Sequence, residues 1–156
     1  MNPDFAEAYN NLGNLLCEQD QLERAIAHYQ QAIQKAPAYA EAHYNLGNAF
    51  KKKHAFDQAQ THYQKALLIK PDYSTAYNSL GNLFQIQGHV DEAIAAYHQA
   101  LSLHSTDAKA CNNLATALQE KGELQDSLNL YETALRIQPD FADAAYNHAM
   151  ILLLMG

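Results

Sequence analysis

The sequence predicts an all-α solenoid built from antiparallel helix pairs, and three periodic sets of residues support this fold class. All four prolines lie on one line with a spacing of 34 residues or a multiple of it, at Pro3, Pro37, Pro71 and Pro139. The glycines form two further lines with the same spacing, Gly13, Gly47 and Gly81, and Gly88, Gly122 and Gly156. Four tyrosines do likewise, at Tyr29, Tyr63, Tyr97 and Tyr131. Repetition at a fixed spacing of this size is typical of solenoid proteins.

The first helix of each repeat is clearest over residues 40–53. Ala42, Leu46, Ala49 and Phe50 recur there at helical spacing and share one face. The glycine that follows Leu46 is expected to face the partner helix, where a side chain would hold two backbones apart. The leucines on the same line are expected to fill the remaining gaps between helices; they are Leu12, Leu46, Leu80 and Leu114.

A turn follows the first helix. Gly88 and Gly122 lie where a left-handed residue ends a helix. Asp20 and His54 take the same place in the first two repeats. Aspartate and histidine tolerate the left-handed region better than branched residues, so the turn is expected to survive there.

The second helix of each repeat is clearest over residues 56–69. Phe56, Ala59, Tyr63 and Ala66 mark its apolar face at helical spacing. The proline line comes where this helix must stop before the next repeat begins.

The order Tyr9-x2-Leu12-Gly13-x2-Leu16, Ala25-x3-Tyr29-x2-Ala32 and Pro37 resembles the tetratricopeptide repeat (TPR) signature, with tyrosine in place of its usual tryptophan. The fourth copy departs from it at Cys111, Ala115 and Ser127. The resemblance implies a right-handed superhelix that forms a single solenoid domain over 1–156. The expected units are repeats at approximately 6–39, 40–73, 74–107 and 108–141, and the first helix of a fifth repeat at 142–155.

Both ends interrupt a repeat. Residues 2–5 match residues 70–73, the tail of a repeat, and Gly156 falls on the turn line before any further second helix. We therefore expect a piece of a longer array.

Composition and charge argue against several classes of protein and partner. Hydrophobic residues make up 48% of the 156 residues, which excludes a disordered chain. A net charge of -7 disfavours nucleic acid as a partner. The longest apolar run, residues 149–155, is too short to span a membrane. Two cysteines, Cys17 and Cys111, cannot form a disulfide framework, so we expect a cytoplasmic protein.

The first helices carry many carboxamides at the positions that line the concave groove in tetratricopeptide solenoids. The candidate peptide-binding residues are Asn10, Asn11, Asn14, Tyr44, Asn45, Asn48, Asn78, Ser79, Asn82, Asn112 and Asn113. A carboxamide both donates and accepts hydrogen bonds, so it can bind a peptide main chain whatever the side chains of that peptide. Alternatively, these amides bond to each other and tie adjacent helices together.

The carboxamide ladder is similar to that in the superhelix of O-linked N-acetylglucosamine transferases, which holds protein substrates. This similarity favours recognition of a peptide backbone.

Lys51, Lys52 and Lys53 form the only basic run, at the end of a first helix near the groove rim. They fit a solvated helix C-terminus or, alternatively, a docking point for an acidic ligand segment.

No catalytic motif appears, so we expect no enzyme activity and no cofactor. No two of the eight histidines are three or four residues apart, so no metal site is expected. His28 and His62 share a line on second helices and are expected at the surface.

Apolar residues replace the polar groove positions in the last helix. Met150 stands on the line of Asn14, and Leu153 and Leu154 follow it. Exposed apolar surface of this kind marks an interface. The helix is expected to pack on a missing remainder of the protein, to pair with a second copy of the chain, or to fray.

The sequence therefore predicts a protein-interaction module, or scaffold, that binds an extended protein or peptide segment in the groove. Two alternatives remain: a substrate-recruiting arm of a larger enzyme such as a protein O-glycosyltransferase, and a self-assembling scaffold.

Overall fold

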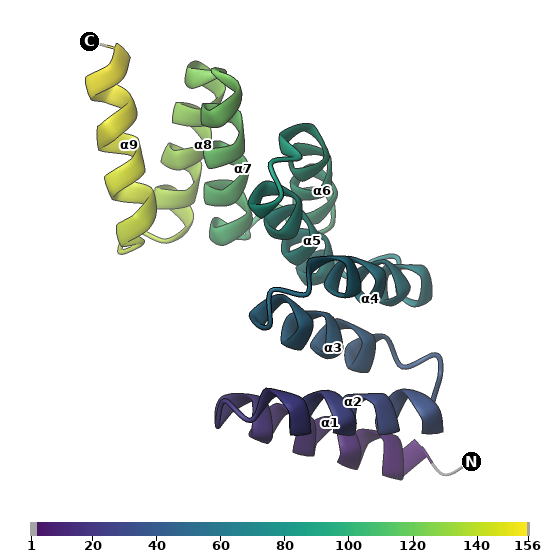
Figure 1. Cartoon of the computed structure of the whole chain (residues 1–156). Coiled ribbons are helices and arrows are strands. Elements are labelled where there is room, and N and C mark those ends of the chain that lie inside the picture. Colours follow the sequence, from purple (N-terminus) through teal and green to yellow (C-terminus); the bar gives the residue numbers. More distant parts are fainter. Residues whose placement is uncertain (1–2, 156) are drawn as a thin grey trace. The chain divides into compact units, whose positions relative to one another are not determined.

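The computed structural model describes residues 3–155, which form nine α-helices and no strand (Figure 1). The residues beyond this range that entered the predictions, Asn2 and Gly156, lie outside the described part. The helices are α1 (Pro3–Glu18), α2 (Leu22–Lys35), α3 (Ala40–Lys52), α4 (Phe56–Ile69), α5 (Ser74–Ile86), α6 (Val90–Leu103), α7 (Ala108–Lys121), α8 (Leu124–Ile137) and α9 (Ala142–Met155). The predicted all-α class is confirmed.

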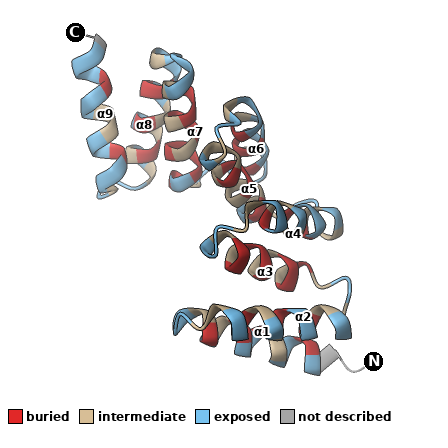
Figure 2. Cartoon of the chain, viewed as in Figure 1, coloured by how far each residue is buried: buried red, intermediate tan, exposed pale blue. Residues whose placement is uncertain are grey.

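The chain divides into two compact units, Met1–Ser79 and Leu80–Gly156, with the division inside α5. In the first unit α1 packs against α2, α2 against α3, and α3 against α4. In the second unit α6 packs against α7, α7 against α8, and α8 against α9. Buried residues lie in stripes along the helices and are dense on α3 and α7 (Figure 2).

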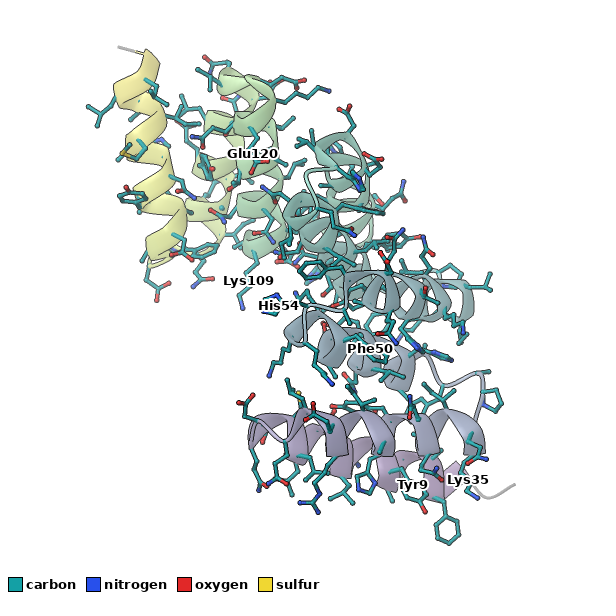
Figure 3. All side chains as sticks on the ribbon, in the orientation of Figure 1. Tyr9, Lys35, Phe50, His54, Lys109 and Glu120 are labelled. Atoms are coloured by element: carbon teal, nitrogen blue, oxygen red, sulfur yellow. The ribbon has the colours of Figure 1, made fainter. Side chains whose placement is uncertain are left out.

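The predicted left-handed turns after first helices are confirmed. Gly88 and Gly122 have φ values of 79° and 86°, and Asp20 and His54 both have φ 58°. The turn at His54 (Figure 3) is closed by two backbone hydrogen bonds, from His54 N to Lys51 O at 2.9 Å and from Ala55 N to Phe50 O at 2.9 Å. This is the Schellman arrangement of a helix end. Asp20 and His54 adopt it although neither is glycine.

The predicted close approach of first and second helices is confirmed at Gly47. A Cβ atom placed there would lie 2.8 Å from Cδ1 of Tyr63, which is too close for two carbon atoms. The same holds at Gly13, where the distance to Cε1 of Tyr29 would be 2.5 Å. Glycine at this line lets the tyrosine ring pack directly on the neighbouring backbone.

The leucine line is buried except at its first member. Leu46, Leu80 and Leu114 are at most 7% exposed, whereas Leu12 is 41% exposed. The prediction that Leu12 fills a gap between helices is therefore wrong. Among the described helices α1 packs against α2 and α3, so Leu12 has no preceding helix pair to cover it.

The expected surface location of His28 and His62 is also wrong, because both side chains are half-buried. The His62 ring stacks on Phe50 of α3 with ring centroids 5.6 Å apart, and its Nδ1 lies 3.1 Å from Nδ1 of His43. The His28 ring stacks on Tyr9 of α1 at 5.9 Å. The His28 and His62 position on the second helix faces an aromatic residue of the first helix, so both imidazole rings pack between the two helices.

Candidate functional site

A pocket of about 420 Å³ in the first unit brings together three of the predicted groove asparagines. Its walls come from the ends of α1 and α3 and from one residue of α2. The lining residues are Asn14, Cys17, Glu18, Tyr29, Asn45, Asn48, Lys51 and Lys52. We call this set the carboxamide pocket.

Two tyrosine hydroxyls orient the amides of the carboxamide pocket. Tyr29 Oη donates to Asn14 Oδ1 at 2.9 Å, and Tyr63 Oη donates to Asn48 Oδ1 at 2.7 Å. Both tyrosines are almost fully buried, and burial raises the pKa of each phenol well above its ordinary value. The phenols therefore stay protonated and act as donors, and each asparagine oxygen is held by a fixed second-helix residue.

A third amide is oriented from the neighbouring repeat. Asn45 Nδ2 donates to Asn10 Oδ1 at 2.9 Å. Asn10 is only 4% exposed, so its side chain belongs to the packing between α1 and α3. Asn45 is half-buried and lines the pocket. The lateral bond thus fixes the direction in which the Asn45 amide presents its remaining atoms.

Lysines at the end of α3 give the pocket a positive rim. Lys51 is half-buried, and burial lowers the pKa of its ammonium group. Lys52 Nζ lies 3.6 Å from the Cys17 sulfur. Lys53 points elsewhere and pairs with Glu23 at 2.9 Å. Two lysines and one carboxylate, Glu18, therefore surround the pocket amides.

The remaining candidates of the first unit lie outside the carboxamide pocket. Asn11 is exposed on α1, and Asn78 is half-buried on α5. Tyr44 Oη and Ser79 Oγ are 3.3 Å apart and form a lateral contact between α3 and α5. The Tyr44 ring also packs against Tyr73, with centroids 5.1 Å apart. This group continues the row of polar contacts between successive first helices.

The second unit repeats the pattern with different side chains. Asn147 Nδ2 donates to Asn112 Oδ1 at 3.4 Å, and Asn112 is 8% exposed. Asn82 and Asn113 are half-buried. Tyr97 Oη donates to Gln85 Oε1 at 2.9 Å, in place of the asparagine used in the first unit. Asn10 and Asn112 therefore hold first helices together, as the structural interpretation of the ladder expects.

Sequence reasoning missed Glu18 and Tyr29 as lining residues. A signal existed for Glu18, which lies four residues after Asn14 on α1, one helical turn along the same face. Lys52 stands in the same relation to Asn48. Tyr29 was predicted only as a packing residue, because spacing does not show that its hydroxyl reaches the pocket.

The last helix carries exposed apolar residues. On α9, Met150 is 39% exposed, Leu153 78% and Leu154 64%, while Ile151 between them is fully buried. Burial of Ile151 anchors α9 to the core that includes Tyr131 and Ala144. The opposite side of the helix therefore presents leucines to solvent.

Within residues 3–155, no helix combines the length and apolar character needed to cross a bilayer. The same residues contain no group of three or more histidine, cysteine or acidic side chains placed to hold a metal ion.

Three family models match the chain. One described as TPR repeat matches residues 13–54, and two described as tetratricopeptide repeat match residues 40–73 and 72–140. Comparison with curated protein sequences gives no match.

Several solved structures are similar to the chain. YrrB, described as a TPR protein with an unusual peptide-binding site, is 26% identical with a TM-score of 0.78, covering 94% of this chain and 76% of YrrB. PilF of Pseudomonas aeruginosa is 21% identical with a TM-score of 0.91, covering 97% and 69%. MamA is 25% identical with a TM-score of 0.81, covering 90% and 82%. Periodicity, helix pairing and the three family models together identify the chain as a member of the tetratricopeptide repeat family.

Proposed function

We propose that this protein is an interaction module that binds an extended peptide segment of a partner protein in the carboxamide pocket. The observation that carries the proposal is the convergence of three oriented amides, Asn14, Asn45 and Asn48, in one pocket. Family membership supports a protein-interaction scaffold. The likeness to YrrB, which is described as having a peptide-binding site, supports a peptide as the ligand.

The three amides offer both donors and an acceptor, as the carbonyl and N–H groups of an extended peptide main chain require. The side-chain oxygens of Asn14 and Asn48 accept hydrogen bonds from tyrosine hydroxyls. The NH₂ groups of these two residues can therefore donate to peptide carbonyls. Asn45 donates through Nδ2 to Asn10, so its oxygen is what the pocket offers to a peptide N–H. Two donors and one acceptor can therefore bind a backbone without reading its side chains.

The lysines at the rim favour a peptide with acidic side chains. Lys51 and Lys52 lie on the same wall as Asn48, and a carboxylate beside them forms charge-assisted hydrogen bonds. The lowered pKa of Lys51 reflects desolvation of its ammonium group, which an incoming carboxylate would compensate. An acidic peptide is also the ligand that the rim would steer toward the pocket in an otherwise acidic protein.

We further propose that the chain acts by binding alone, without catalysis, and works in the cytoplasm. Both cysteines are free, which suits a reducing compartment.

Calorimetric titration with a synthetic peptide of alternating serine and glutamate tests the proposal. Replacing Asn14 and Asn48 together by alanine should weaken binding by about tenfold, because each amide contributes roughly 0.5–1.5 kcal/mol. Asn129, an exposed asparagine on α8, supplies the control variant Asn129→Ala, which should bind like the unmodified chain. Equal affinity of all three proteins would refute the carboxamide pocket as the site.

The charge of the rim is tested separately. Lys51→Gln combined with Lys52→Gln should weaken the serine–glutamate peptide and reduce the salt dependence of its affinity. A serine–glutamine peptide should be unaffected by the same change. Lys35→Gln with Lys109→Gln removes the same charge at exposed positions outside the pocket and should leave both affinities unchanged.

A second candidate function rests on α9. Its exposed residues Met150, Leu153 and Leu154 form an apolar face that we propose pairs with a second copy of the chain. Light scattering over a range of protein concentrations should then show a mass that rises toward a dimer. A constant monomer mass at high concentration would reject self-association.

A further inference from the structure

A second pocket of the first unit lies at the turn between α2 and α3. The turn begins after Lys35, the last residue of α2, which Figure 3 labels. Its volume is about 420 Å³, and its walls are mostly apolar. The lining residues are Ala6, Glu7, Ala36, Pro37, Ala38 and Tyr39. We call it the Tyr39 pocket.

The corresponding place in the next repeat is occupied by a lysine side chain. One period of 34 residues relates Ala36 to Lys70, Tyr39 to Tyr73 and Glu7 to Glu41. Lys70 Nζ lies 4.8 Å from the centre of the Tyr73 ring and 3.3 Å from Glu41 Oε1. The lysine therefore combines a cation–π contact with an ion pair.

The backbone conformation at the two positions is nearly the same, so the two Cα–Cβ bonds point in nearly the same direction. Ala36 ends α2 with φ -138° and ψ 87°, and Lys70 ends α4 with φ -129° and ψ 87°. Each N–H donates to the carbonyl four residues earlier, Ala32 O and Ala66 O respectively. Each carbonyl in turn accepts from the tyrosine three residues later, at 3.1 Å from Tyr39 N and 3.2 Å from Tyr73 N.

The first repeat thus has the tyrosine ring (Tyr39) and the carboxylate (Glu7), but alanine (Ala36) takes the place of the lysine. Tyr39 is half-buried, and burial, followed by the negative charges of Glu41 and Glu7, raises the pKa of its phenol. Ala6, Ala36 and Pro37 supply apolar walls of the kind that an aliphatic stem packs against.

We infer that the Tyr39 pocket is a binding site for a lysine side chain of a partner protein. The aliphatic stem lies along Ala36 and Pro37, and the ammonium group meets the Tyr39 ring and the Glu7 carboxylate, as Lys70 meets Tyr73 and Glu41. This site is distinct from the carboxamide pocket and takes a ligand group of opposite charge to that favoured by Lys51 and Lys52.

The test is an NMR titration of the unmodified chain with Nα-acetyl-lysine amide. Backbone amide signals of Ala36, Ala38 and Tyr39 should shift in a saturable way. Nα-acetyl-norleucine amide, which keeps the stem and lacks the ammonium group, should bind at least about tenfold more weakly. Equal shifts from both compounds would overturn the inference.

Two substitutions exploit the internal repeat. Ala36→Lys should fill the pocket with the chain's own side chain and abolish the shifts. The control Ala27→Lys adds the same charge at an exposed position on the same helix and should leave them unchanged. Lys70→Ala should open the equivalent place, so that a second set of shifts appears around Tyr73. Binding by Ala36→Lys that equals binding by Ala27→Lys would also overturn the inference.

The outcome is independent of the proposed peptide site. Asn14→Ala with Asn48→Ala should leave lysine binding intact, and Ala36→Lys should leave the serine–glutamate peptide affinity intact. Failure of one site therefore does not imply failure of the other.

Discussion

The contact between Gly47 on α3 and the Tyr63 ring on α4 yields a prediction about stability. A Cβ at residue 47 would lie 2.8 Å from Cδ1 and Cε1 of Tyr63 and 3.3 Å from the Ala59 carbonyl oxygen. Carbon atoms in ordinary contact are about 3.5–4.0 Å apart. In Gly47→Ala the two helices must therefore move apart by roughly 1 Å, or the ring must move by a similar amount.

The magnitude follows from two opposing effects. Tyr63 is fully buried and its hydroxyl is bound to Asn48 Oδ1 at 2.7 Å, so the ring cannot move without losing packing or that hydrogen bond. Overpacking of this kind costs about 1–3 kcal/mol. Alanine in place of glycine inside a helix contributes about 1 kcal/mol in the other direction. We expect a net loss of about 1 kcal/mol in the free energy of unfolding.

Urea unfolding followed by far-ultraviolet circular dichroism measures this change. Gly47→Ala should lower the unfolding midpoint in the unmodified chain. In a Tyr63→Ala background, where the ring is gone, the same substitution should raise the midpoint, because only the gain in helix propensity remains. If Gly47→Ala stabilises the chain while Tyr63 is present, the helices have room for a side chain and the packing argument is wrong.

Substitution of Gly122 tests the effect of backbone strain on stability without a close contact between helices. A Cβ there would meet nothing within 4 Å, but its φ is 86°. Gly122→Ala should cost roughly 1–2 kcal/mol through the left-handed backbone. Tyr131→Ala should leave that cost unchanged, in contrast to the change of sign expected at Gly47.

Three further predictions concern single side chains. Burial lowers the pKa of His62 to about 4 in the folded chain, below the ordinary 6.5. Protons therefore bind the unfolded chain preferentially, and the free energy of unfolding should fall as pH drops from 6.5 toward 4. In urea titrations at several pH values His62→Gln should reduce this fall, whereas His98→Gln at an exposed site should not. Tyr63→Phe should lower the free energy of unfolding by about 1 kcal/mol through loss of the Asn48 hydrogen bond, and Tyr146→Phe on the exposed side of α9 should not change it. Leu153→Glu should hold the chain as a monomer in light scattering, and an unchanged mass profile would count against α9 as the contact.

Local features of the fold could be predicted from sequence where the 34-residue spacing of the repeat fixes them. The left-handed turns at Asp20 and His54 follow from spacing alone, since the helix must end there whatever residue is present. Leu12 was misjudged because burial depends on which helices surround a residue, and its line gives the same apolar signal in every repeat. The stacking of His62 on Phe50 depends on the rotation of one helix against another, which a polar residue type does not reveal.

In the candidate site, too, the positions of the residues could be predicted from sequence, whereas their hydrogen-bond partners could not. The resemblance to tetratricopeptide solenoids implied that Asn14, Asn45 and Asn48 lie on the groove side of the first helices, and the three line one pocket. Spacing could not show which atoms of each amide are already bonded. The hydroxyls of Tyr29 and Tyr63 decide that question across a helix pair, and Asn10 decides it across two repeats.

Binding of a peptide main chain in the carboxamide pocket is tested most directly by the side-chain NH₂ signals of its asparagines. These signals are resolved in a heteronuclear NMR spectrum and can be followed while the serine–glutamate peptide is added. If the pocket binds the main chain, the NH₂ signals of Asn14 and Asn48 shift together and saturate, while that of the exposed Asn129 stays in place. Unmoved signals of Asn14 and Asn48 at peptide concentrations that saturate binding would contradict main-chain binding in the pocket.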